Sequence, residues 1–254
     1  MKKYELTEET KVIGGKTLFR IRALRSFGGI KAGDLGGFIE NERNLSHGGN
    51  AWVGGNAEVY GNAQVVGYAQ VGGNAQVGGN AQVNGYAQVG GNAWVEDNAQ
   101  VGGNARVSGD AWVEDNARVD GDAWVEDNAR VDGDAWVGGY ARVNGDAQVV
   151  GDARVDGNAQ VGGDAWVGGN ARVGGDGLIN SNNDYLCEQG LGSRNRSASF
   201  FKCKDGHIHV LCGCFSGNLD EFENKVKEEH GNSKYSKEYL GFIEVVKTHF
   251  EVRQ

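Results

Sequence analysis

The chain has 254 residues, including 44 glycines and no proline, and its formal net charge at pH 7 is −9. This acidic balance argues against free nucleic acid as a partner, because binding phosphates needs a basic surface. There is no apolar run long enough for a membrane helix and no pattern typical of a signal peptide, so we expect a cytoplasmic protein without membrane contact.

The first 34 residues predict an N-terminal cap. Residues 11–13 and 16–24 are two strand-like runs separated by Gly14-Gly15, a dipeptide typical of tight hairpin turns. Beyond them, less regular coils begin at Leu35 and pass through Asn41 and His47. We therefore expect a hairpin that covers the start of the regular region that follows.

From Val53 to Val173 valine returns at every sixth position, and Ile179 extends the series. Alanine keeps a parallel register from Ala51 to Ala171, so the units follow the pattern Ala-x-Val-x-Gly-Asn/Asp, with Asp in place of Gly at positions 97, 115 and 127. In Ala-x-Val the alanine and valine share one face of a short strand, and the middle residue takes the other. The remaining three positions predict a turn, because Gly supplies left-handed backbone and Asn or Asp bonds locally to backbone. Apolar spacings of two and four exclude a helix of period 3.6.

Short strands joined by regular corners predict a three-sided parallel β-solenoid. Three units make one triangular coil, and the coils between Val53 and Ile179 would form a prism roughly 34 Å long at one inter-strand spacing per coil. Its interior would be a dry ladder of valine and alanine, and its ends need caps. The expected organisation is a cap over residues 1–34, a solenoid over residues 35–179 and a small α+β domain over residues 180–254.

The unit resembles the hexapeptide motif of left-handed parallel β-helix proteins, and Val101-Gly102-Gly103-Asn104-Ala105-Arg106 is one instance. The resemblance covers about half of the chain and implies left-handed coils, although the general rule for crossovers favours the right hand. The two end segments are similar to those of uncharacterised hexapeptide-repeat proteins of bacteriophages and prophages. They read YELTEETKVIGGKTLFRIRALRSFGGIKAGDLGGFIE and LGSRNRSASFFKCKDGHIHVLCGCFSGNLDEFENKVKEEHG. This similarity implies a phage or prophage source and a bacterial host cell.

Acidic residues concentrate between positions 96 and 156. This stretch contains fourteen acidic residues and five arginines, so its net charge of −9 equals that of the whole chain. Within this stretch the block VEDNARVDGDAW, residues 113–124, is repeated at 125–136. We call ten of these acids the acidic belt: Glu96, Asp97, Glu114, Asp115, Asp120, Asp122, Glu126, Asp127, Asp132 and Asp134. A localised negative surface favours docking on a basic protein surface, for example as a mimic of DNA in the groove of a host enzyme. The alternative is a solvated surface that keeps a repetitive sheet soluble.

All six tryptophans and six arginines occupy the outward middle position of Ala-x-Val. Residues 18 apart should lie above one another, which gives the rows Arg106–Trp124–Arg142, Trp94–Trp112–Arg130 and Arg118–Trp136–Arg154–Arg172. Trp112, Arg118, Trp124, Arg130 and Trp136 are candidate recognition residues, since Trp and Arg are enriched in binding hot spots. The alternative is cation–π packing that covers the sheets.

After Ile179 the period stops. SNND, residues 181–184, predicts a loop, and residues 197–202 and 207–215 predict a hairpin around Lys204-Asp205-Gly206. A helix should begin at Asn218 with a capping-box-like start and end near Gly231, and a second should run from about Ser236 to Phe250. One loop follows two glycines and is a candidate anion site for a nucleotide phosphate, with a plain basic loop as the alternative: Ser193, Arg194, Asn195 and Arg196.

Thiols and imidazoles gather after the repeats, at Cys203, His207, His209, Cys212 and Cys214. Their spacing fits poorly with the C-x₂₋₄-C pairs of structural zinc sites. Strand alternation would place Ile208, Val210, Cys212 and Cys214 on one face and the histidines on the other. We therefore expect buried, reduced cysteines, no metal site and no cofactor.

The leading functional expectation is a non-enzymatic binding protein that presents a rigid acidic solenoid to a basic surface of a host or phage protein. The first alternative is an acyltransferase with an acyl-coenzyme A donor. The resemblance implies it, because hexapeptide β-helices are best known as trimeric acyltransferases with a histidine base. Here, however, no histidine lies between His47 and His207. A second alternative is a small-ligand sponge in the C-terminal domain. A homo-oligomer, trimer or dimer, is also expected.

Overall fold

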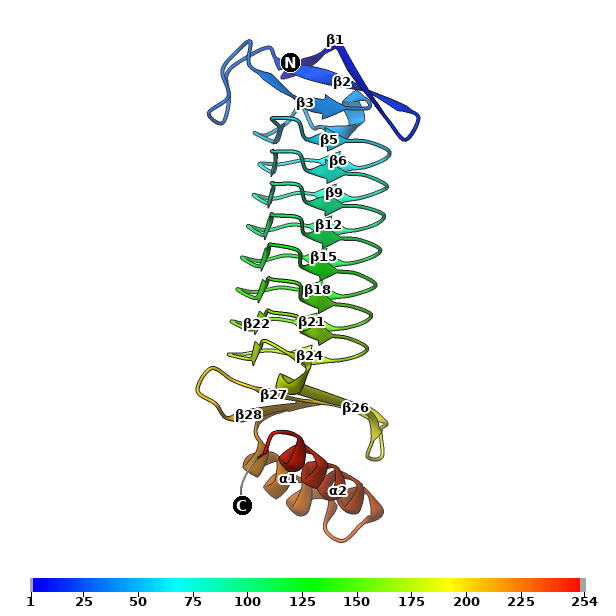
Figure 1. Ribbon diagram of the computed structural model, residues 1–254, viewed down its shortest axis with the longest axis vertical. Helices are drawn as coiled ribbons and strands as arrows, with labels where there is room; N and C mark the ends of the chain where they lie inside the picture. The colour runs from blue at the N-terminus through cyan, green and yellow to red at the C-terminus, as the bar shows by residue number, and fades with distance from the viewer. Residues whose placement is uncertain (1, 252–254) are drawn as a thin grey trace.

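The computed structural model describes residues 2–251. The chain forms a long column of stacked coils, with the N-terminal hairpin at one end and two helices at the other (Figure 1). The predicted three-sided parallel β-solenoid is confirmed, and so are the N-terminal hairpin and the small C-terminal α+β domain.

The N-terminal cap consists of an antiparallel hairpin, β1 (Tyr4–Ile13) and β2 (Lys16–Ala23), followed by β3 (Leu35–Ile39) and the short 3₁₀ helix η1 (Glu42–Asn44). The turn lies at Gly14-Gly15 as predicted, and both glycines have positive φ. Strand β3 pairs antiparallel with β2 on one side and parallel with the first coil on the other. The cap therefore continues one sheet of the solenoid and leaves that edge covered.

The solenoid has three faces, and every strand from β4 to β24 consists of the x-Val pair of one unit, while the last strand, β25, has isoleucine in place of valine. Face 1 continues from β3 with β5 (Glu58–Val59), β8 (Gln76–Val77), β11 (Trp94–Val95), β14 (Trp112–Val113), β17 (Arg130–Val131), β20 (Gln148–Val149) and β23 (Trp166–Val167). Face 2 contains β6 (Gln64–Val65), β9 (Gln82–Val83), β12 (Gln100–Val101), β15 (Arg118–Val119), β18 (Trp136–Val137), β21 (Arg154–Val155) and β24 (Arg172–Val173). Face 3 contains β4 (Trp52–Val53), β7 (Gln70–Val71), β10 (Gln88–Val89), β13 (Arg106–Val107), β16 (Trp124–Val125), β19 (Arg142–Val143), β22 (Gln160–Val161) and β25 (Leu178–Ile179).

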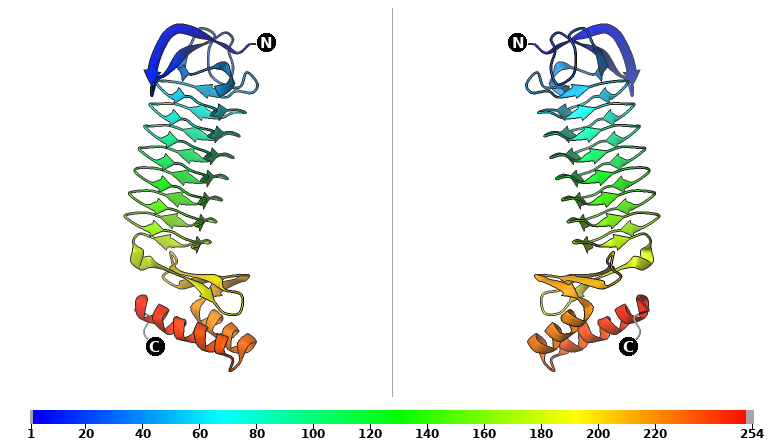
Figure 2. Two further views of the ribbon diagram at one scale, coloured as in Figure 1. Left: turned by 90° about the vertical axis from the view of Figure 1, so that its right-hand side faces the viewer. Right: turned by 90° about the vertical axis from the view of Figure 1, so that its left-hand side faces the viewer.

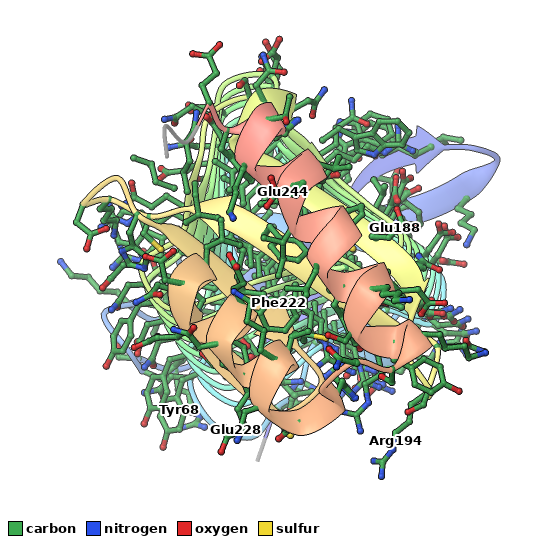
Figure 3. All side chains as sticks on the ribbon, turned by 90° about the horizontal axis from the view of Figure 1, so that it is seen from below. Tyr68, Glu188, Arg194, Phe222, Glu228 and Glu244 are labelled. Atoms are coloured by element: carbon green, nitrogen blue, oxygen red, sulfur yellow. The ribbon has the colours of Figure 1, made fainter. Side chains whose placement is uncertain are left out.

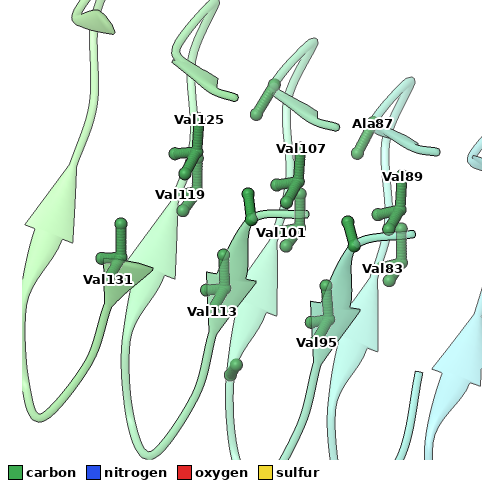
Figure 4. Packing of buried hydrophobic residues seen from close by; sticks show 14 of the residues in the cluster. Val83, Ala87, Val89, Val95, Val101, Val107, Val113, Val119, Val125 and Val131 are labelled. Atoms are coloured by element: carbon green, nitrogen blue, oxygen red, sulfur yellow. The ribbon is translucent and has the colours of Figure 1, made fainter. Parts of the chain in front are cut away.

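The interior is the predicted ladder of valine and alanine. Each valine of the six-residue series is at most 2% exposed, and each alanine from Ala51 to Ala171 is fully buried. Valines 18 residues apart lie directly over one another, as Val101 and Val119 do on face 2. Figure 4 shows these side chains pointing inward from successive coils. Because each coil buries its apolar residues only against its neighbours, the stability of the column is a sum of local terms.

The corners follow the predicted turn chemistry in their backbone but not in their side chains. Gly103 has a φ of 60°, and Asp115, at the equivalent position of its unit, has a φ of 57°. The asparagines were expected to bond within their own turn. Instead, their amides form ladders between coils, such as Asn80 Nδ2 to Asn98 Oδ1 at 3.0 Å and Asn98 Nδ2 to Asn116 Oδ1 at 3.1 Å. The stacking of identical corners brings the amides within reach of one another, so the bond to the next coil replaces the local one.

The C-terminal domain packs a four-stranded antiparallel sheet between the last coil and two helices (Figure 2). Its elements are η2 (Asn182–Asp184), β26 (Tyr185–Leu191), β27 (Arg196–Lys202), β28 (Ile208–Cys212), β29 (Phe215–Asn218), α1 (Leu219–His230) and α2 (Lys234–His249). Phe201 and Cys203 close the end of the solenoid core. On the opposite face, Phe200 and Val210 pack against the helices in a second core.

Several local predictions for this domain are wrong. Residues 182–184 of the SNND segment form the 3₁₀ helix η2, because Ser181 and Asp184 build a capping box. The single strand predicted over residues 207–215 is broken at Gly213, where φ is 63°, and continues as β29. Cys214 lies in that turn and is exposed, not buried. By contrast, the capping box at Asn218 and the end of α1 at Gly231 are confirmed.

Candidate functional site

The structure distributes the acidic belt over all three corners of the solenoid. Asp120 and Asp122 lie on the corner that follows face 2, and Glu126 and Asp127 on the corner that follows face 3. The other six share the corner between faces 1 and 2, where Asp152 joins them one coil further down. We call this corner the acidic ridge: Glu96, Asp97, Glu114, Asp115, Asp132, Asp134 and Asp152. The belt is therefore one contiguous ridge with two smaller acidic pairs elsewhere.

Some carboxylates of the belt have structural roles. Asp115 Oδ2 accepts a hydrogen bond from the backbone N–H of Gly133 at 3.2 Å, and Asp127 Oδ2 accepts one from Gly145 at 3.1 Å, each one coil further on. Arg130 pairs with Glu114 and, at 2.9 Å, with Asp132 Oδ2. Asp97, Asp115 and Asp134 are nonetheless exposed. The ridge thus keeps a negative balance after this pairing. Its seven carboxylates have Arg130 beside them on face 1, and Arg118 and Arg154 lie with Asp134 on face 2.

The tryptophan and arginine rows lie on the three faces in the predicted order. On face 3, the guanidinium groups of Arg106 and Arg142 lie 4.9 and 4.8 Å from the ring centroid of Trp124, one on each side. On face 1, the rings of Trp94 and Trp112 stack with centroids 5.1 Å apart. The arginine–tryptophan arrangement on face 3 has the geometry of cation–π packing. Both arrangements fix the aromatic rings in place on the surface.

The ridge and the rows meet on face 2. A hollow of about 430 Å³ there is lined by the belt acids Asp120 and Asp134 and by residues of the face 2 row. Its full lining is Asn116, Arg118, Asp120, Asp134, Trp136 and Arg154. Four sequence-predicted residues from two different sets therefore come together at one place, beside the acidic ridge.

The candidate anion loop forms the turn between β26 and β27, with Asn195 at a φ of 46°. Ser193, Arg194 and Arg196 line a pocket of about 500 Å³ that Lys225 of α1 also lines. The rest of its wall includes Phe215, Phe222, His230 and Tyr239, so cationic groups and aromatic rings face one space. Figure 3 shows Arg194 at the rim of the domain and Phe222 between the helices.

A second cleft, of about 600 Å³, lies between the last coils and the C-terminal sheet. Arg154 and Arg172 of face 2 line it from the solenoid, and Arg196 and Cys214 line it from the domain. Arg196 and Cys214 also line the pocket described above, so the two spaces adjoin. Sequence reasoning did not find this cleft, because its arginines are far apart in the chain.

The histidines His207 and His209 lie on the same sheet face as Cys203. One ligand atom from each of the three residues lies within 4.8 Å of the other two. Burial raises the pKa of the Cys203 thiol to about 11, with added effects from the carboxylates of Asp205 and Asp176. Burial, and then His207, lowers the pKa of His209. The predicted separation of cysteine from histidine holds for Cys212, which faces the helices.

The remaining sequence candidates for chemistry have structural contacts. His47 stacks on Tyr4 with ring centroids 4.4 Å apart, and its Nδ1 accepts from the backbone N–H of Lys3 at 3.2 Å. The pKa of Cys187 and that of Cys212 are both raised by burial, which keeps these thiols protonated. His47 therefore belongs to the packing of the N-terminal cap.

Comparison with known proteins bears on the repeat region. Residues 87–103 and 99–114 match the model of a family described as the YdcK β-solenoid repeat. These residues span β10 to β14. No curated protein matches the chain. Within residues 2–251, no helix combines the length and the apolar character needed to cross a membrane. The family match and the stacked parallel strands together identify the chain as a β-helix repeat protein.

Proposed function

We propose that this chain is a non-enzymatic binding protein of bacteriophage or prophage type, which presents its acidic ridge to a basic surface of a host or phage protein in the bacterial cytoplasm. The observation that carries the proposal is the collection of seven carboxylates on one corner, of which Arg130 pairs with two. A field of one sign along a rigid edge speeds association with an oppositely charged surface and selects against other partners.

Aromatic side chains border the ridge on both sides. Trp94 and Trp112 stack on face 1, immediately before the corner, and Trp112 is 40% exposed. Trp136 lies on face 2, immediately after it, in the hollow that Asp134 also lines. Tryptophan is enriched among the residues that dominate binding energy, so the ridge has apolar anchors beside its charges. The stacked coils hold all of these groups in place, which limits the entropy lost on binding.

The charge density of the ridge approaches that of DNA. Three successive coils carry two ridge carboxylates each, and the coils are one inter-strand spacing, about 4.8 Å, apart. That is roughly one carboxylate per 2.4 Å along the axis, or one net charge per about 2.9 Å after Arg130 is counted, against about one per 1.7 Å on duplex DNA. A nucleic-acid-binding groove is therefore the basic surface that this proposal favours, as in a counter-defence inhibitor that mimics DNA.

The test uses two variants with equal net charge. The ridge variant is E96Q/D97G/E114Q/D115G/D132N/D134N. The control variant is D110N/D122N/E126Q/D127G/D146N/D164N, which removes six acids from the other two corners. A partner is first isolated from the bacterial host with the natural chain, identified and purified. Its dissociation constant is then measured by calorimetry with all three chains, at low and physiological salt.

We expect the ridge variant to bind at least tenfold more weakly and to lose most of its salt dependence, since the attraction between the two surfaces is electrostatic. The control variant should bind within about threefold of the natural chain, because its ridge is intact. Equal binding by all three chains, with circular dichroism showing that each is folded, would make the ridge a solvated surface only.

A second candidate function is favoured by the pocket in the C-terminal domain. Arg194 and Arg196 bring two cations to a space of about 500 Å³ whose walls also carry aromatic rings, while Lys225 lines it paired with Glu229 at 3.4 Å. This combination suits a small ligand with a phosphate and a flat ring, such as a nucleotide. Calorimetry with nucleotides, and separately with coenzyme A, tests it on the natural chain and on R194S/R196S.

Micromolar nucleotide binding that R194S/R196S abolishes would support the small-ligand sponge. Tight coenzyme A binding would instead favour an acyltransferase over both binding proposals. The absence of heat with either ligand would leave the ridge as the only candidate binding surface of the two. The two proposals can therefore fail independently, because the ridge variant does not alter this pocket.

A further inference from the structure

The hairpin of β27 and β28 places one thiol and two imidazoles on the sheet face that meets the end of the solenoid. Phe201 pairs with His209 across the two strands, and the backbone N–H of Cys203 donates to His207 O at 2.9 Å. Side chains at paired positions share a face, so Cys203, His207 and His209 point to the same side. The three potential ligand atoms lie within 4.8 Å of one another.

In each imidazole, one ring nitrogen contacts a neighbouring side chain that orients the ring. His207 Nδ1 lies 2.5 Å from Asp205 Oδ1, and His209 Nε2 lies 2.9 Å from Ser216 Oγ. The remaining nitrogens, His207 Nε2 and His209 Nδ1, face each other at 3.5 Å. This is long for a hydrogen bond between the rings. Metal-binding histidines commonly have this arrangement, in which a carboxylate or hydroxyl orients the ring and the other nitrogen is free to bind.

We propose that Cys203 Sγ, His207 Nε2 and His209 Nδ1 form a binding site for a transition-metal ion, with Zn²⁺ as the expected ion. Tetrahedral coordination at standard Zn–N and Zn–S lengths separates two nitrogens by about 3.4 Å and a nitrogen from a sulfur by about 3.6 Å. The imidazole pair already has the first separation. Each sulfur–nitrogen separation is at most 4.8 Å, so the thiol has to move by no more than about 1.2 Å, a distance within reach of a change in the side-chain torsion of one cysteine.

The ligand set and its surroundings favour such an ion. Thiolate and imidazole ligands select zinc and copper over magnesium and calcium. The carboxylates of Asp205 and Asp176 act electrostatically on Cys203, and the same negative field attracts a dication. On binding, the sulfur–metal bond replaces the S–H bond, and the thiol proton goes to solvent. Three protein ligands leave a fourth position for water or another small ligand.

The position of the site gives the ion a structural effect. Cys203 belongs to the core at the end of the solenoid, and its neighbour Lys204 donates from its backbone N–H to Asp176 O at 3.1 Å. His209 belongs to β28, on the side of the C-terminal sheet. A bound ion would therefore connect the two sides of the hairpin turn, at the junction between the two parts of the protein. It should raise the melting temperature of the C-terminal domain in particular.

The experiment uses the full-length chain without an affinity tag, treated with a chelator and kept reduced. Co²⁺ is added as a probe, because a cobalt–thiolate charge-transfer absorption reports a bound cysteine directly, and Zn²⁺ is then added in competition. We expect one Co²⁺ per chain, displaced by one Zn²⁺. The absorption should disappear in C203S but persist in C214S, whose altered cysteine lies outside the cluster and is exposed.

Affinity measurements on histidine and carboxylate variants complete the test. H207N should weaken Zn²⁺ binding at least tenfold. D205N should weaken it about 10- to 100-fold, since Asp205 orients the ring of His207 and adds negative charge near Cys203. His207 is exposed, so H207N leaves the core intact even if C203S unfolds. The proposal is overturned if the natural chain binds no Co²⁺ at micromolar concentrations, or if H207N binds as tightly as the natural chain.

Discussion

Lys3 Nζ donates a hydrogen bond of 2.6 Å to the carbonyl oxygen of Ala51, the residue before the first strand of face 3. Tyr4 acts in the same way beside it, since its hydroxyl donates to Leu45 O at 2.8 Å. Both side chains are fully buried. The cap therefore uses two polar groups from the hairpin to satisfy carbonyl groups of the first coil, which no earlier coil can reach.

The first prediction is a pH dependence of the cap. Burial, with Arg25, lowers the pKa of Lys3 from 10.5 to about 8. Above pH 8 the folded chain has released this proton while the unfolded chain still binds it, so stability rises with pH in this window. Between pH 7.5 and 9.5 the free energy of unfolding of the cap should rise by about 2 kcal/mol. Denaturant unfolding curves, recorded with a signal from the cap at each pH, measure this free energy.

The matched control is K3M, which removes the titrating group and should lose this rise. The window ends below pH 10 because burial raises the pKa of Tyr4, whose ionisation in the unfolded chain acts in the opposite direction. A natural chain and a K3M chain with the same pH profile would contradict the prediction.

The second prediction concerns the core. V119D places a carboxylate in a fully buried position between Val101 and Val137, with no partner. Burying an unpaired charge should cost more than about 4 kcal/mol and unfold the coils around it. Far-ultraviolet circular dichroism and thermal melting measure the loss. R118D, at the adjacent exposed position, should change stability by less than about 1 kcal/mol. Similar melting of the two variants would be inconsistent with a dry interior.

The third prediction concerns the left-handed corner positions. Asp115 has a φ of 57°, where a β-branched residue is strained. D115V should lower the free energy of unfolding by about 1–2 kcal/mol. D115G should stay within about 0.5 kcal/mol of the natural chain, because glycine relieves strain while losing the bond to Gly133. Chemical denaturation of both variants decides it, and equal stability of the two would count against a left-handed corner.

The fourth prediction concerns the amide ladder. Asn98 occupies a central rung, bonded to Asn80 above and Asn116 below. N98A should therefore lower the free energy of unfolding by about 1 kcal/mol, a modest loss because the ladder is solvated. Asn170 has the same turn position, and its side chain makes no ladder hydrogen bond among residues 2–251, so N170A is the control. Melting curves that shift equally for both variants would show that the ladder adds nothing.

Much of the solenoid was predictable because the six-residue period allows one arrangement of buried and outward residues. The six-residue spacing of Val53 to Val173 predicts the buried series and the stacking of residues 18 apart, both confirmed. The acidic ridge was also within reach, since Glu96, Glu114 and Asp132 are 18 apart. The belt instead grouped acids by their position in the chain, which spreads them over three corners.

The C-terminal domain was less predictable because no period constrains it. Strand β26 was missed since it is an edge strand whose residues are half-buried or exposed, so its sequence lacks an apolar alternation. The cluster of Cys203 with His207 and His209 depends on how the turn between them sets the strand register. The alternation of side chains along one strand cannot predict that Cys203 and the histidines share a face, because Cys203 lies across the turn from both histidines.

A coil of three units also constrains any sequence that alternates every two units. In residues 113–136 the outward position alternates between tryptophan and arginine from one unit to the next. Because a coil contains three units, an odd number, the residue one coil further on is always of the other kind. Trp124 therefore lies between Arg106 and Arg142. The same alternation sets Asp115 over Gly133. Tandem duplication of a twelve-residue block therefore produces alternating stacks on all three faces at once, whereas duplication of a whole coil would place like residues on like.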